Sequence, residues 1–259
     1  MRIASIGHAV FAATMIALGI LGLIQGDYTQ MFQPVPKSLP AREALAYVCA
    51  VLCVATGAGL LWRQTAATAA RVLLAFLIVW TLLCKARFVV LAPLVEGSWQ
   101  SFGENLVVIA GAWVLYVVFA TDADRRTLAF AVGDSGLRIA RVLYGVAMIA
   151  FGLSHFFYVE LTAPLVPGWL LWPTFWAYFT GVTYLLAGVA MLVGRQAALA
   201  AMLSTLQMGL FTVLVWVPFM VAGTIDAGKW GEFVVSWVLT ASGWVVADAC
   251  RGKFAVGRN

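Results

Sequence analysis

The feature that most constrains this chain is a series of eight apolar runs, each long enough to cross a lipid bilayer. The runs lie at about residues 3–25, 43–62, 72–94, 104–120, 139–158, 175–193, 197–222 and 233–249. A bilayer core requires about 20 apolar residues per helix, and lipid offers the backbone no hydrogen-bond partner. Strands of a membrane barrel would instead alternate over roughly ten residues. We therefore expect an all-α integral membrane protein with eight transmembrane helices, in which the last helix of each half is the shortest.

The composition supports this expectation and excludes two other classes of protein. The 259 residues are 63% hydrophobic and only 10% charged, whereas soluble domains carry about 25% charged residues. The net charge of +5 does not indicate a nucleic-acid partner, because the basic residues are scattered through short loops. The expected surroundings are membrane lipid.

The basic residues predict the orientation of the helices. Eleven of the 16 Lys and Arg residues fall on one side of the predicted membrane, three on the other, and Lys85 and Arg87 fall within a span. Short cytoplasmic loops carry an excess of Lys and Arg. Both termini are therefore predicted to be cytoplasmic in a multi-pass protein, and the family resemblance given below implies a bacterial inner membrane.

An internal repeat divides the chain into two halves. The segment from Ala13 to Gly19 resembles that from Val146 to Gly152, and Phe102-Gly103-Glu104 resembles Trp230-Gly231-Glu232. Between these matches the offset stays between 128 and 133 residues. We predict two four-helix repeats at residues 1–121 and 138–259, joined by a cytoplasmic linker at 122–137. Because each unit has an even number of helices, the repeats should run parallel, about an axis along the membrane normal.

One motif links the second half to a known family. His155-Phe156-Phe157-Tyr158 ends the first helix of that half, and Thr162 to Trp169 and Phe175 to Tyr178 follow it. In these segments, and in its four-helix unit, the chain resembles the DoxX group of bacterial membrane proteins. The resemblance implies the fold, and it implies membrane redox work such as that of quinone-reducing thiosulfate oxidoreductase subunits.

Lys85 and Arg87 are the strongest candidates for a site. A cation near the centre of a span costs at least about 2.5–3.5 kcal/mol, so it usually faces a partner or a cavity. The matched positions in the second half hold Trp216 and Pro218, so the fold itself does not require charge there. The alternative is that both side chains extend to the outer interface and face lipid.

Four further residues complete the predicted ligand site. Glu104 and Glu232 each open the last helix of a half, where a carboxylate is also favoured by the helix macrodipole alone. His155 and Tyr158 share a helix face near the outer surface; His155 either lines a polar site or makes a structural hydrogen bond.

No spacing of His, Cys and carboxylates predicts a metal site. Cys49 and Cys53 lie one turn apart in a span and predict packing rather than dithiol chemistry.

These observations rank three functions. The first is a membrane component of a redox system that binds a quinone-like or amphipathic molecule at the outer leaflet. If the chain is an enzyme, it is then a quinone-linked oxidoreductase subunit that receives electrons from a redox partner subunit or a bound cofactor. The alternatives are a transporter of small molecules or ions, and a non-catalytic assembly or scaffold subunit. The sequence determines neither the ligand nor the oligomeric state.

The predicted topology has a direct test. Compartment-sensitive reporters fused at Asn259 and inserted at Lys37 should report opposite sides of the membrane. Asn259 lies on the side predicted to be rich in Lys and Arg, and Lys37 lies on the side predicted to be poor in them. The same compartment for both reporters would contradict the topology.

Overall fold

The computed structural model describes residues 3–254, and these residues form helices and connecting turns without a strand. Eight of the helical spans are long and apolar enough to cross a membrane, which confirms the predicted multi-pass membrane protein. In two of the spans, a short π-helical segment separates two α-helices. The spans are α1 (Ile6–Gln25), α2 (Arg42–Leu60), α3 with α4 (Ala66–Trp80 and Ala86–Leu91), α5 (Glu96–Phe119), α7 (Gly133–Phe157), α9 (Pro173–Val193), α10 with α11 (Ala197–Phe211 and Val217–Val221) and α12 (Ala227–Cys250).

The last span of each half is longer than the sequence predicted. Both α5 and α12 have 24 residues, so the expectation that they would be the shortest is wrong. Their first turns contain Gly, Ser and charged residues, which end an apolar run but do not end a helix. Glu104 and Glu232 consequently lie within α5 and α12 rather than at their starts. The macrodipole acts only over the first turn, so it does not account for either carboxylate.

The connection between the halves is partly helical. Within the predicted linker 122–137, α6 spans Asp122–Thr127 and α7 already begins at Gly133. Arg71 of α3 donates to both carboxylate oxygens of Asp124, at 3.0 and 2.9 Å, and the Thr121 backbone and hydroxyl donate to the same carboxylate. Burial works to raise the pKa of Asp124, but these hydrogen bonds outweigh it and hold the pKa below its ordinary value. The ionised carboxylate thereby ties α6 to α3.

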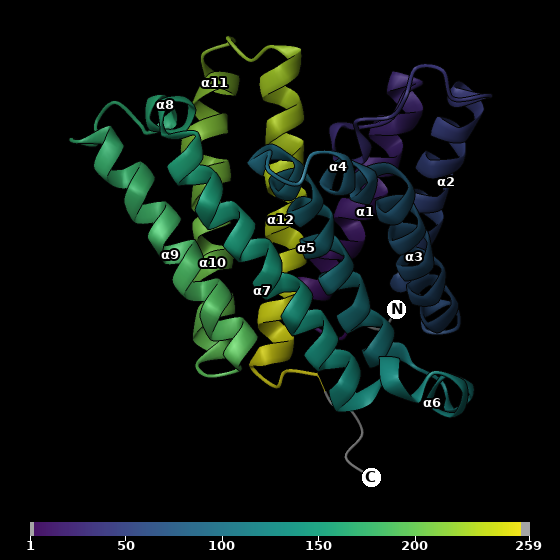
Figure 1. The fold of residues 1–259 in the computed structure, drawn as a ribbon. Helices are drawn as coiled ribbons and strands as arrows, with labels where there is room; N and C mark the ends of the chain where they lie inside the picture. Colours follow the sequence, from purple (N-terminus) through teal and green to yellow (C-terminus); the bar gives the residue numbers. More distant parts are fainter. Residues whose placement is uncertain (1–2, 255–259) are drawn as a thin grey trace.

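The two halves are intermixed rather than packed as two separate bundles (Figure 1). α5 and α12 lie next to each other at the centre, and α5 also packs on α3 while α12 packs on α10. The first helix of each half packs on the last helix of the other half: α7 lies along α5, and α1 lies along α12. α2 and α3 cover one flank and α9 and α10 the other (Figure 1). The Gly7 N–H donates to Asp248 at 3.2 Å, so α1 begins where α12 ends, on one side of the molecule.

Glycines set the closest helix approaches. A Cβ atom at Gly19 of α1 would lie 2.4 Å from the Ala50 carbonyl oxygen and 2.8 Å from the Val54 nitrogen of α2. In the other half, a Cβ at Gly152 of α7 would lie 2.9 Å from the Gly181 carbonyl oxygen of α9. Small residues allow such backbone contact between membrane helices, where lipid provides little hydrophobic driving force for association.

Replacing Gly19 by Ala should therefore separate α1 from α2. We expect Gly19→Ala to lower the free energy of unfolding by about 1–3 kcal/mol, because the obstructing atoms are backbone and cannot rotate away. Thermal unfolding in detergent measures the effect. Gly168→Ala is the control, since no atom lies within 4 Å of a Cβ there. Equal melting temperatures for the two variants would show that the contact is not tight.

Candidate functional site

Each half contains one π-helical segment in its third span. These segments are Thr81–Lys85, between α3 and α4, and Thr212–Trp216, between α10 and α11. A π turn inserts one extra residue into an α-helix, which rotates the following side chains and often marks a functional site. Lys85 and Trp216 each end their segment, and both side chains are buried. The π turns thus direct an ammonium group inward in the first half and an indole inward in the second.

A cavity of about 350 Å³ lies at one end of the second half, on the side opposite the meeting point of α1 and α12. We call it the outer cavity, because the sequence predicts that this side faces outward. Helices α7, α9, α10 and α12 surround it, α5 of the first half closes one side, and the segment that follows α7 covers it. That segment comprises α8 (Val159–Thr162) and the 3-10 turn Ala163–Leu165. Ligand pockets in proteins have volumes of about 300–1,000 Å³.

Four of the six predicted site residues line this cavity together: Glu104, His155, Tyr158 and Glu232. Glu104 is half-buried and Glu232 is exposed, so the two carboxyl groups differ in their access to solvent. Both nevertheless line the same cavity, Glu104 from α5 and Glu232 from α12. Residues far apart in the sequence therefore form one site with two acidic groups.

The hydrogen bonds of His155 and Tyr158 determine what each can offer a ligand. Nδ1 of His155 lies 2.8 Å from the Phe151 carbonyl oxygen. Because a carbonyl can only accept, Nδ1 carries the proton, and Nε2 of a neutral imidazole then has the free lone pair. The hydroxyl of Tyr158 accepts from the Gly97 N–H at 3.1 Å, which joins the end of α7 to the start of α5 and leaves the phenolic proton to donate. His155 thus makes a hydrogen bond within α7, and it also lines the cavity.

Lys85 and Arg87 do not line the cavity, and they differ from each other. Lys85 is 2% exposed, and its ammonium group donates to Ser101 of α5 at 2.7 Å. Arg87 is exposed, with its guanidinium over the ring of Phe88 at 5.1 Å. Lys85 is thus buried against α5, the helix that also carries Glu104, whereas Arg87 lies on the exposed surface.

The walls of the cavity are largely aromatic and apolar. Phe151, Tyr184, Phe211 and Trp216 face it, and the Trp216 indole N–H donates to Ser236 at 3.1 Å. Sequence analysis did not assign Tyr184, Phe211 or Ser236 to the site. Comparison of the repeats did contain a signal for Trp216, because it occupies the position of Lys85.

The corresponding region of the first half is filled. Tyr28, Phe32, Phe76 and Trp80 form an aromatic cluster with ring centroids 5.1–6.1 Å apart. The Trp80 indole N–H donates to the Phe32 carbonyl at 3.2 Å, which fixes the cluster to the turn after α1. The aromatic cluster thus occupies the region of the first half that corresponds to this cavity, and a separate cavity of about 540 Å³ lies between α1 and α12.

Comparison with protein-family models, curated proteins and solved structures finds no match. Within residues 3–254, no group of three or more His, Cys, Asp and Glu side chains is placed to hold a metal ion. The function must therefore be argued from the geometry of the site.

The contrast between Lys85 and Arg87 generates a prediction. Lys85→Met should lower the free energy of unfolding by about 1–3 kcal/mol, because it removes the hydrogen bond from the buried ammonium group to Ser101. Arg87→Met should change it by less than about 0.5 kcal/mol, as is usual at exposed positions. Thermal unfolding of both variants in detergent measures the difference. Equal effects would contradict the assignment of distinct roles.

Proposed function

We propose that this chain is a DoxX-like membrane protein that binds a quinone, or a similarly flat amphipathic molecule, in the outer cavity as part of a membrane redox system. The proposal rests on one observation: the same cavity is lined by aromatic side chains and by four residues that can form hydrogen bonds, Glu104, Glu232, His155 and Tyr158. Aromatic side chains pack on a planar ring, and carboxyl, imidazole and phenol groups can bond its oxygens.

Quinone chemistry needs groups of this kind. Reduction of a quinone consumes a proton for each electron, and side-chain carboxyl and imidazole groups are the usual donors and acceptors of protons. His155, Glu104 and Glu232 line the cavity, and they would take part in this exchange. A redox partner subunit or a bound cofactor would supply the electrons.

The same proposal includes the arrangement and location of the molecule. We infer two parallel repeats related by an axis along the membrane normal. The π segments support this, since they begin 131 residues apart at Thr81 and Thr212. The contact of α1 with α2 in one half and of α7 with α9 in the other supports it as well. The excess of Lys and Arg on the side where α1 begins and α12 ends supports cytoplasmic termini in a bacterial inner membrane.

The transporter alternative requires a path across the second half, and the described conformation closes it. Between the outer cavity and the inner end, Tyr144 and Met148 of α7 and Met191 of α9 are fully buried. The Tyr144 hydroxyl lies 2.9 Å from the Ser204 hydroxyl of α10. This barrier favours binding from the outer side over transport.

Binding of a short-chain quinone to the protein in nanodiscs tests the proposal. The double variant Glu104→Gln/His155→Phe should weaken saturable binding by about tenfold or more, because it removes a hydrogen bond to a charged group and the imidazole acceptor. Lys37→Gln is the control, since Lys37 is exposed and outside the cavity. Equilibrium titration gives the dissociation constants.

Three outcomes separate the candidate functions. Saturable binding that the double variant weakens supports the proposal. Uptake of a solute into proteoliposomes, without saturable quinone binding, would support the transporter. If the wild-type protein neither binds quinone nor moves a solute, the third candidate function, a non-catalytic assembly or scaffold subunit, is favoured.

A further inference from the structure

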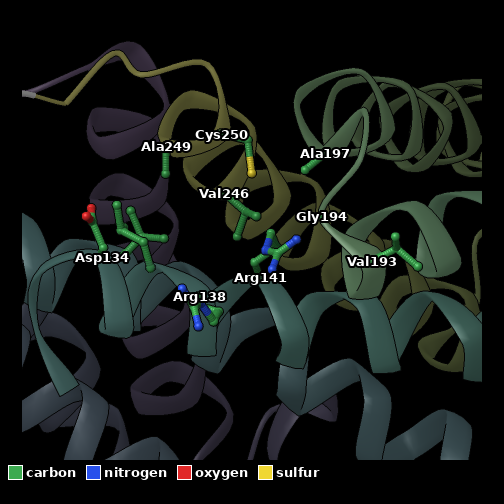
Figure 2. Close-up of a pocket in the computed structure, with 11 residues that line it drawn as sticks. Asp134, Arg138, Arg141, Val193, Gly194, Ala197, Val246, Ala249 and Cys250 are labelled. Atoms are coloured by element: carbon green, nitrogen blue, oxygen red, sulfur yellow. The ribbon is translucent and has the colours of Figure 1, made fainter. Parts of the chain in front are cut away.

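A second cavity, of about 530 Å³, lies at the inner end of the second half (Figure 2). Its walls come from the first turns of α7, the turn between α9 and α10, the end of α12, and Val114 of α5. It is on the same side as the meeting point of α1 and α12. The buried layer of Tyr144, Met148 and Met191 separates it from the outer cavity.

Two arginines of α7, Arg138 and Arg141, line this inner cavity. Among the described residues, neither guanidinium takes part in an ion pair or a side-chain hydrogen bond, although four ion pairs occur elsewhere in that part of the chain. Asp134 is the one carboxylate in the lining, and Figure 2 shows it pointing away from both arginines. The inner cavity therefore carries uncompensated positive charge.

Arg141 lies close to the backbone of the turn between α9 and α10. Its guanidinium lies against Gly194, where an added Cβ would approach Nη1 to 2.1 Å. Gly194 ends α9 in the left-handed region, at φ +81, which favours glycine. The turn between α9 and α10 thus leaves room for an arginine that points into the cavity, as Figure 2 shows.

The first half has no such charge at the matched position. In the repeat, His8 corresponds to Arg141. His8 is fully buried, lies 3.1 Å from the Leu60 carbonyl oxygen through Nε2, and packs against Phe119 with ring centroids 5.2 Å apart. A buried, bonded imidazole closes the inner end of the first half, whereas the second half keeps two unpaired guanidinium groups beside an open volume.

We propose that the inner cavity is a binding site for a phosphate group, of the kind carried by anionic lipid headgroups, with Arg138 and Arg141 as its ligands. Guanidinium groups present paired N–H donors that match phosphate oxygens. Arg138 and Arg141 lie where the apolar stretch of α7 begins, at the depth where lipid headgroups meet hydrocarbon. This site does not depend on a ligand in the outer cavity.

The test measures thermal unfolding of the detergent-solubilised protein with three additives: phosphatidylglycerol, phosphatidylcholine, and inorganic phosphate against chloride at equal ionic strength. Phosphatidylglycerol should raise the melting temperature of wild type more than phosphatidylcholine does. Arg138→Gln/Arg141→Gln should weaken the response by roughly 30-fold in lipid concentration, as expected for two basic residues at an anionic surface. A response to inorganic phosphate that the same variant loses would assign the site to free phosphate instead of the lipid.

Two further variants keep the test decisive. Arg125→Gln/Arg126→Gln removes equal charge from exposed positions of α6 and should respond like wild type. Arg141→Lys keeps the charge without the paired donors, so it should fold and show an intermediate response. If wild type and Arg138→Gln/Arg141→Gln respond equally to every additive, or if both double variants lose the response equally, the proposed site is wrong.

Discussion

The crossing of α5 and α12 is the contact on which the rest of the architecture depends. Gly111 of α5 lies against the backbone of Ser242 in α12, where an added Cβ would come within 3.1 Å of the carbonyl oxygen. α7 packs on α5 and α1 packs on α12, so the first helix of each half is attached to the last helix of the other. In lipid, helix association is driven by van der Waals packing at such close backbone contacts, whereas in water it is driven by hydrophobic burial.

The central pair also explains how the two halves can differ in their cavities. Side chains at equivalent positions around a shared scaffold are free to differ, provided the α5–α12 contact is preserved. In the first half, Trp80 and its aromatic neighbours fill the outer end and His8 closes the inner end. In the second half, the outer end has an acidic and aromatic cavity, and the inner end has a basic one. The buried Tyr144 layer keeps the two volumes apart.

Sequence patterns predicted the fold well because lipid imposes a simple rule. Each span needs an unbroken apolar run, and all eight runs are helices. Hydropathy failed at helix starts such as Glu96–Gly103, where a helix continues through polar residues outside the apolar run. Lys85 was a predicted site residue because the second repeat has no charge at the matched position. His155 was one because it begins the His155-Phe156-Phe157-Tyr158 motif. The π turns are not visible in hydropathy, so the sequence could not separate buried Lys85 from exposed Arg87, nor place Trp216 and Phe211 at one cavity.

An experimental structure of the protein purified from its native membrane, with its lipids retained, tests the central claim most directly. The account predicts non-protein density for a flat molecule in the outer cavity, bounded by Glu104, His155 and Trp216, and none in the aromatic cluster of the first half. An outer cavity closed by its own side chains, or equivalent density in both halves, would contradict it.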